Sequence, residues 1–117
     1  MATKNKLRIV IKIGSNLITE NENILNYEVI KNLCNQIATI QKDHNQVIIV
    51  SSGAVAAGSQ YLSKFEKEIK INNNSIVQKQ LLASIGQPIL MNAYEKYFSQ
   101  SSIMISQALL SLSLIHI

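Results

Sequence analysis

Two stretches of the sequence are the most informative about its fold: Ile9-Val-Ile-Lys-Ile-Gly-Ser15 and Val47-Ile-Ile-Val-Ser-Ser-Gly-Ala54. Each is a run of β-branched residues, which is typical of a strand buried on both faces of a parallel sheet. Each run ends at glycine and serine, whose backbone N–H and hydroxyl groups suit an anion. The two stretches therefore predict two buried strands with phosphate chemistry at their ends.

The segment between these strands reads as an amphipathic helix. Asn26 is a good N-cap, and Asp43 lies where the helical pattern stops. A strand, a helix and a second strand within about forty residues form a βαβ unit, whose right-handed crossover makes the two strands parallel. The apolar positions of this helix repeat at helical spacing: Ile30, Leu33, Cys34, Ile37 and Ile40.

The rest of the chain extends this α/β pattern. A second helix is predicted from Ala54, followed by a polar loop over residues 63–75. Residues 76–98 have helical spacing, as one helix or two pieces, because Gly86 and Pro88 interrupt the run. Residues 102–106 read as a third short strand. We therefore expect an α/β fold with a mainly parallel sheet.

The composition indicates a single domain with a hydrophobic core and does not indicate a nucleic-acid-binding protein. The chain has 117 residues, of which 47% are hydrophobic, enough for one domain with a core. Its net charge of +4 is spread along the chain, which is not the footprint of a nucleic-acid-binding protein. The single cysteine, Cys34, excludes a disulfide within the chain. Without a long apolar segment or cleavage site near the start, we expect a cytoplasmic protein that does not enter the membrane.

Lys12 and the two glycine turns are the candidate anion-binding groups. Lys12 lies inside an apolar strand near the carboxyl end of the sheet, where ligands of parallel sheets collect. Gly14 would let a phosphate approach the backbone. An edge lysine that reaches water is the alternative for Lys12, and a plain helix N-cap is the alternative for residues 51–53.

The sequence does not indicate a P-loop, a Gly-x-Gly-x-x-Gly dinucleotide site or a metal site. Gly53 and Gly58 have Walker-like spacing, but Ser59 and Gln60 follow where a P-loop requires lysine and Ser or Thr. No Gly-x-Gly-x-x-Gly is present. The two histidines are isolated from other ligand types, so no metal site is predicted.

Three motifs, taken together and in order, resemble the amino-acid kinase family, and within it the branch that phosphorylates L-glutamate. The motifs are Val10-Ile-Lys-Ile-Gly-Ser-Asn-Leu-Ile-Thr19, Val47-Ile-Ile-Val-Ser-Ser-Gly-Ala-Val-Ala-Ala-Gly58 and Lys79-Gln-Leu-Leu-Ala-Ser-Ile-Gly-Gln-Pro88. The resemblance runs from about Leu7 to Leu110. It implies a three-layer α-β-α sandwich, here incomplete, because the second half of the family's domain has no counterpart in the chain. Without that half, we expect an exposed sheet edge and an apolar face of the sheet that lacks its cover.

The resemblance also implies a reaction. The γ-phosphoryl group of ATP, with Mg²⁺, would pass to the side-chain carboxylate of L-glutamate, giving L-glutamyl 5-phosphate, the first step of proline biosynthesis. By matching position, Lys12 would be catalytic and contact the phosphate, Gly14 and Ser15 would line the phosphate turn, and Ser52 with Gly53 would bind glutamate. The complete enzyme would be a homo-oligomer.

The chain departs from the family near its end. We predict that residues 1–111 are the amino-terminal part of a kinase domain and that the uncharged residues 112–117 are an off-pattern tail. We expect the 117-residue chain alone to lack kinase activity. Two alternatives stay open: a non-catalytic fragment that binds phosphate or nucleotide or pairs with kinase subunits, and an amino-acid kinase with a different acceptor.

Overall fold

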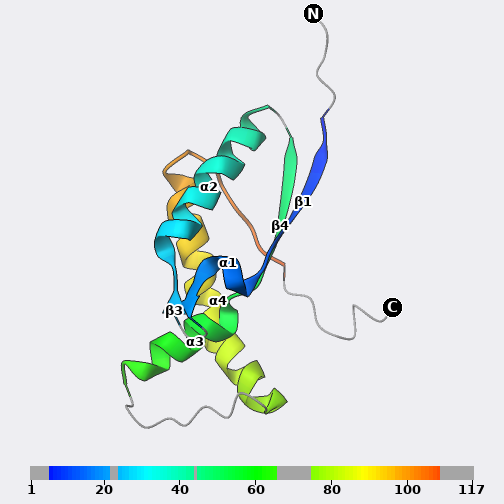
Figure 1. The fold of residues 1–117 in the computed structure, drawn as a ribbon. Helices are drawn as coiled ribbons and strands as arrows, with labels where there is room; N and C mark the ends of the chain where they lie inside the picture. The colour runs from blue at the N-terminus through cyan, green and yellow to red at the C-terminus, as the bar shows by residue number, and fades with distance from the viewer. Residues whose placement is uncertain (1–5, 22–23, 44, 66–74, 109–117) are drawn as a thin grey trace, which may run out of the picture.

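The parallel pairing of two strands organises the fold (Figure 1). The structure is a computed structural model that describes residues 6–21, 24–43, 45–65 and 75–108. The elements run in the order β1 (Arg8–Ile13), α1 (Ser15–Ile18), β2 (Thr19–Asn21), β3 (Ile24–Leu25), α2 (Tyr27–Lys42), β4 (Gln46–Ser51), α3 (Ala54–Ser63) and α4 (Ile76–Ser99).

β1, α2 and β4 form the expected βαβ unit. Arg8 pairs with Gln46 and Ile13 with Ser51. The Ser52 amide donates to the carbonyl of Ile13 at 2.8 Å, which continues the ladder beyond both strands. The predicted α/β class and parallel sheet are thus confirmed.

The predicted cap of α2 is confirmed as well. The side chain of Asn26 accepts a hydrogen bond from the amide of Val29 at 3.2 Å, which satisfies one of the first-turn N–H groups. Ile30, Cys34 and Ile37 on one side of α2 are buried in the core. This helix therefore holds its place by capping at one end and burial along one face.

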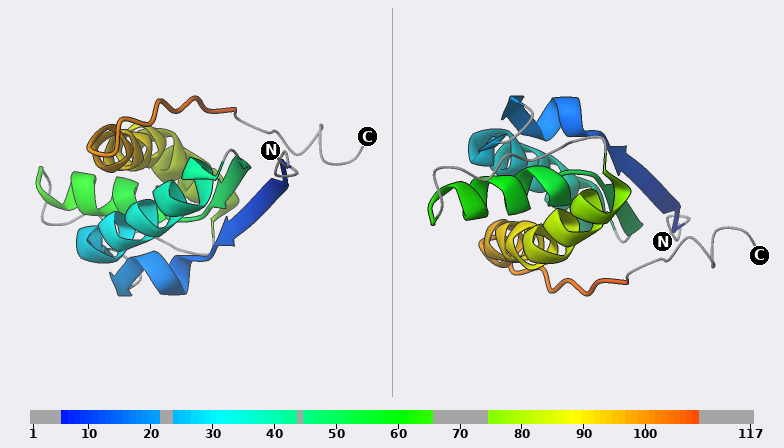
Figure 2. Two further views of the ribbon diagram at one scale, coloured as in Figure 1. Left: turned by 90° about the horizontal axis from the view of Figure 1, so that it is seen from above. Right: turned by 90° about the horizontal axis from the view of Figure 1, so that it is seen from below.

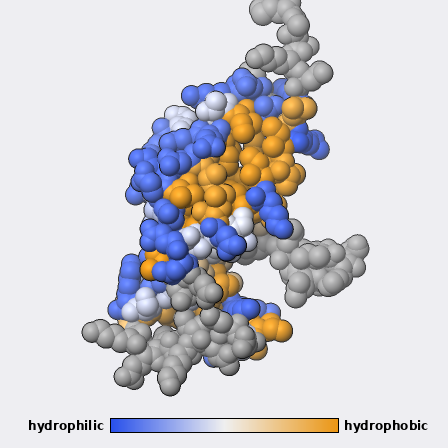
Figure 3. Space-filling model, in the orientation of Figure 1, coloured by the Kyte–Doolittle hydropathy of each residue, from blue (hydrophilic) through white to orange (hydrophobic). Residues whose placement is uncertain are grey.

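The two strands are covered on one face only within the described residues. Ile11, Val47 and Ile49 pack on the core, whereas Val10 and Ile48 have 64% and 57% of their surface exposed. In both views of Figure 2, the helices α2, α3 and α4 lie to one side of β1, and apolar surface is visible over the strands in Figure 3. The prediction of burial on both faces was therefore wrong for these residues, because β-branched runs indicate a strand but not which faces are covered. The described chain forms the sheet and one helical layer of an incomplete α-β-α sandwich.

α3 and α4 cross at backbone contact. A Cβ atom added to Gly86 would overlap the carbonyl oxygen of Ala54 and lie 2.5 Å from the amide nitrogen of Gly58. One added to Gly58 would overlap the carbonyl of Leu82. The two glycines thus let the helices touch, and this contact fixes Ala54 at the start of α3.

α4 is one continuous helix that passes through Pro88. It begins after Ser75, whose hydroxyl accepts from the amide of Gln78 at 3.3 Å. Of the two possibilities left open by the sequence, one helix or two pieces, the structure has the first.

The third strand predicted over residues 102–106 does not form in the described chain. Ile103 and Ile105 pack on the core and Met104 is 93% exposed, so the alternation of a strand is present. The segment has no ladder to β1 or β4. The alternation of apolar packed residues with exposed ones therefore does not by itself indicate that a segment pairs with a neighbouring strand.

Some predictions concern segments that the structure does not describe or that the sequence did not suggest. Most of the predicted loop, residues 66–74, and the predicted tail, residues 112–117, lie outside the described residues. The short helix α1 and the β2–β3 hairpin were not predicted, because elements of two to four residues leave no periodic pattern.

Candidate active site

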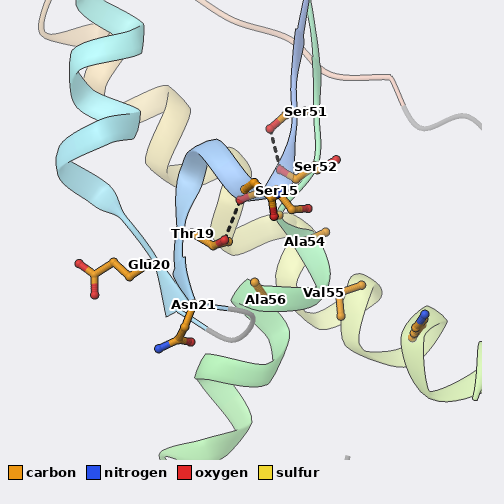
Figure 4. Close-up of a pocket in the computed structure, with 12 residues that line it drawn as sticks. Ser15, Thr19, Glu20, Asn21, Ser51, Ser52, Ala54, Val55 and Ala56 are labelled. Atoms are coloured by element: carbon orange, nitrogen blue, oxygen red, sulfur yellow. Dashed lines mark hydrogen bonds between the residues drawn. The ribbon is translucent and has the colours of Figure 1, made fainter. Parts of the chain in front are cut away.

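A cavity of about 760 Å³ lies where the carboxyl ends of β1 and β4 meet the helices that follow them (Figure 4). Three residues of the predicted site line it: Ser15, Ser52 and Gly53. Ser15 is far from Ser52 and Gly53 in the sequence, and the two turns come together because parallel strands end at the same edge of a sheet. The structure thus joins the two turns that the sequence singled out.

Gly53 shapes the second turn. Its φ is 112°, in the left-handed region that glycine adopts without steric cost. A Cβ atom there would also approach the Cδ1 atom of Ile18 to 2.7 Å. Position 53 therefore requires glycine for the fold, whatever ligand the turn holds.

The start of α3 faces this cavity without a side-chain cap. Gly53 is its N-cap residue, and Ala54, Val55 and Ala56 of the first turn line the cavity. The first N–H groups of a helix have no partner within the helix and carry positive partial charge. This end of α3 is therefore suited to an anionic group in the cavity.

A chain of hydrogen bonds holds the backbone of the second turn. The Ser51 hydroxyl donates to the carbonyl of Ser52 at 2.8 Å and lies 2.7 Å from the hydroxyl of Tyr94 on α4. Because Ser51 uses its one hydrogen on that carbonyl, Tyr94 donates to Ser51. Burial raises the pKa of Tyr94, so its phenol keeps the proton that this bond needs.

The side chains of Ser51 and Ser52 thus differ in their hydrogen bonds. The Ser51 side chain is engaged within the protein, whereas the Ser52 hydroxyl has no hydrogen bond to another described residue. On the other side of the cavity, Thr19 donates to the carbonyl of Ser15 at 2.6 Å, which closes the turn around α1. The Ser52 hydroxyl is the side-chain donor available to a ligand on the β4 turn.

Lys12 and Gly14 do not line this cavity. Lys12 pairs with Val50 near the carboxyl end of β1, and its exposed side chain belongs to the uncovered face of the sheet. Gly14 has φ −81° and ψ 158°, which any residue adopts, and an added Cβ would meet no atom within 4 Å. The fold does not require glycine at 14, and the roles of these two residues stay predictions.

The sequence reasoning missed the rest of the lining. Lys79 begins the third of the three motifs, but the motif alone does not indicate its role. Periodicity does not indicate which turns and helix ends meet at a cavity. The other missed polar residues come from α1 and β2: Asn16, Thr19, Glu20 and Asn21.

The described residues offer no group of three or more His, Cys, Asp or Glu side chains that could hold a metal ion. Among the described helices, even the 24-residue α4 lacks the apolar length that a membrane span requires.

Comparison with known proteins decides the family. The profile of the Amino acid kinase family matches residues 7–115. The chain belongs to the amino acid kinase family. Its relatives in this family include the glutamate 5-kinase of Geobacter metallireducens, 45% identical over 108 residues, which are 92% of this chain and 28% of that protein.

Two further relatives of the same name are similar. The glutamate 5-kinase of Pelobacter propionicus is 40% identical over 89% of this chain and 26% of its own length. That of Alkaliphilus oremlandii is 40% identical over 92% of this chain and 39% of its own length. The chain thus spans between about a quarter and two fifths of the length of these amino acid kinases.

Proposed function

We propose that this chain forms the phosphate turn and part of the acceptor site of a glutamate 5-kinase. Such an enzyme transfers the γ-phosphoryl group of ATP to the side-chain carboxylate of L-glutamate, giving L-glutamyl 5-phosphate, the first step of proline biosynthesis. The observation that carries the proposal is the cavity that joins Ser15 to Ser52 and Gly53 at the ends of two parallel strands. The names of the relatives support the choice of glutamate.

The residues of the chain would act mainly by placing charge. In the reaction a carboxylate oxygen of glutamate bonds to the γ-phosphorus, the bond from that phosphorus to the bridging oxygen breaks, and ADP leaves with the electron pair. Both reactants are anions, so positive groups must offset their repulsion. In the proposal Lys12 contacts the transferring phosphoryl group, and Gly14 and Ser15 hold the phosphates against the backbone.

The acceptor would bind on the β4 side of the cavity. The Ser52 hydroxyl would donate to a glutamate carboxylate, and the uncapped N–H groups at the start of α3 would add positive potential there. The Tyr94–Ser51–Ser52 hydrogen bonds fix the backbone that carries these donors. Little reorganisation would then be needed when the substrate binds.

The residues present fit ATP phosphates better than a metal held by the protein alone. Mg²⁺ in kinases is bound largely through substrate phosphates and waters, and the described residues contain no metal-binding cluster. Mg²⁺ would therefore enter with ATP and neutralise phosphate charge. The roles proposed for Lys12, Ser15 and Ser52 do not depend on where Mg²⁺ binds.

Location and assembly belong to the same proposal. The one cysteine of the chain, Cys34, is buried and unpaired, which fits a reducing compartment such as the cytoplasm. The complete enzyme is proposed to be a homo-oligomer.

A chimera tests the proposed function. The segment of the Geobacter metallireducens glutamate 5-kinase that aligns with this chain is replaced by the chain's own 108 aligned residues. We expect glutamate-dependent release of ADP from the folded chimera. The 117-residue chain alone is the control, and we expect no turnover from it, because it spans only 28% of that relative. A folded chimera that releases ADP at the same rate with and without glutamate would refute the proposal.

A further inference from the structure

The charges that line the cavity are few and unevenly placed. Lys79 is the only cation and Glu20 the only anion among the described lining residues. In Figure 4 the carboxylate of Glu20 points away from Ser15 and Ser52. The carboxylate of Glu20 therefore does not face the serines of the two strand-end turns.

The position of Lys79 in its helix is electrostatically unfavourable. It is the fourth residue of α4, and the first turn contains no acidic residue. A lysine near the amino-terminal end of a helix is repelled by the positive end of the helix dipole. The side chain of Lys79 is exposed, and no acidic side chain of the described residues forms an ion pair with it.

A second source of positive potential faces the same cavity. The uncapped first turn of α3 lines it through Ala54, Val55 and Ala56. The amino-terminal parts of α3 and α4 thus line one cavity, and Lys79, whose side chain is exposed, is the cationic residue of that lining. This arrangement suits an anion that arrives from solution.

The proposed acceptor has two carboxylates, and only one of them reacts with the phosphoryl group. The reacting carboxylate must reach the phosphoryl group near the strand-end turns, where Ser15 and Ser52 lie. A strong ion pair to that carboxylate would weaken it as a nucleophile. Lys79 comes from α4 and not from a strand-end turn, so the carboxylate that does not react is its suitable partner.

We propose that Lys79 binds the non-reacting α-carboxylate of the acceptor and thereby selects an amino acid with two carboxylates. This inference rests on the proposed function and adds a specificity residue to it. An ion pair with a lysine discriminates between a carboxylate and its neutral amide, because the amide lacks the charge that the ammonium attracts.

The test compares two acceptors in the chimera described above. L-Glutamate is compared with L-glutamate 1-amide, which keeps the side-chain carboxylate but has a neutral α-carboxamide. For Lys79→Gln we expect the KM for glutamate to rise about tenfold, with the KM values for the 1-amide and ATP unchanged. Lys79→Arg keeps the charge and should keep the preference for glutamate.

The matched control is Lys96→Gln, which removes an exposed lysine 17 residues further along the same helix, about 25 Å away at 1.5 Å per residue. It should leave all three KM values unchanged. If Lys79→Gln raises the KM of both acceptors equally, or of neither, the role of Lys79 is refuted while the proposed function stands. If the folded parent chimera has no glutamate-dependent turnover, the proposed function itself fails before any variant is compared.

Discussion

The crossing of α3 and α4 leaves no room for a side chain at Gly86. Replacing Gly86 by alanine places a Cβ atom against three backbone atoms: the carbonyl oxygen and carbon of Ala54 and the amide nitrogen of Gly58. Backbone atoms of a packed helix cannot rotate away as a side chain can. The variant can fold only if α3 and α4 move apart.

The expected loss of stability follows from two opposing terms. Overpacking of this kind costs about 3 kcal/mol, the upper end of the usual range, because the contacts are to backbone. Alanine is better than glycine inside a helix and returns about 1 kcal/mol. We therefore expect Gly86→Ala to lower the free energy of unfolding by about 2 kcal/mol, or the melting temperature by about 10 °C.

Urea unfolding followed by circular dichroism measures the difference in the free energy of unfolding between Gly86→Ala and the parent protein. Gly14→Ala is the matched control. Position 14 has room for a Cβ atom and a φ of −81°, so its free energy of unfolding should change by less than about 1 kcal/mol. Equal stabilities of Gly86→Ala and the parent would show that the helices do not cross at backbone contact and that no such contact positions Ala54.

Three further predictions concern individual side chains. In the chimera, Lys12→Ala should lower turnover by about a hundredfold or more with little change in stability, because the side chain is exposed; near-normal turnover would refute its role. Ser52→Ala should raise the KM for glutamate and leave that for ATP nearly unchanged, whereas the reverse pattern would contradict the placement of the acceptor. Burial raises the pKa of the Cys34 thiol from 9.0 to about 12, so between these values the folded chain keeps a proton that the unfolded chain loses, and stability should fall as pH rises above 9. The urea midpoint of Cys34→Ala should fall less steeply over this pH range, and parallel slopes would rule out Cys34 as the cause.

Local sequence patterns predicted the two paired strands and the helix between them. The β-branched runs gave β1 and β4, and the apolar repeat after Asn26 gave α2 together with its cap. These features depend on residues close in sequence, so their patterns can be read along the chain. The strand-end turns followed from them, since the ends of parallel strands meet at one edge.

Tertiary placement could not be predicted in the same way. The exposure of Val10 and Ile48 depends on which elements cover the sheet, and residues 102–106 lack a ladder although they alternate like a strand. Lys79 reaches the cavity only because α4 crosses α3 at Gly58 and Gly86. A prediction of the cavity lining would have required the geometry of that crossing.

We propose that the strand-end cavity belongs to an enzyme whose acceptor is glutamate. The most direct test is the kcat/KM of the chimera for L-glutamate, L-aspartate and carbamate, measured by ADP release under the same conditions. We expect a clear preference for L-glutamate that is weakened by Ser52→Ala. Equal or better use of aspartate or carbamate by the folded chimera would contradict it.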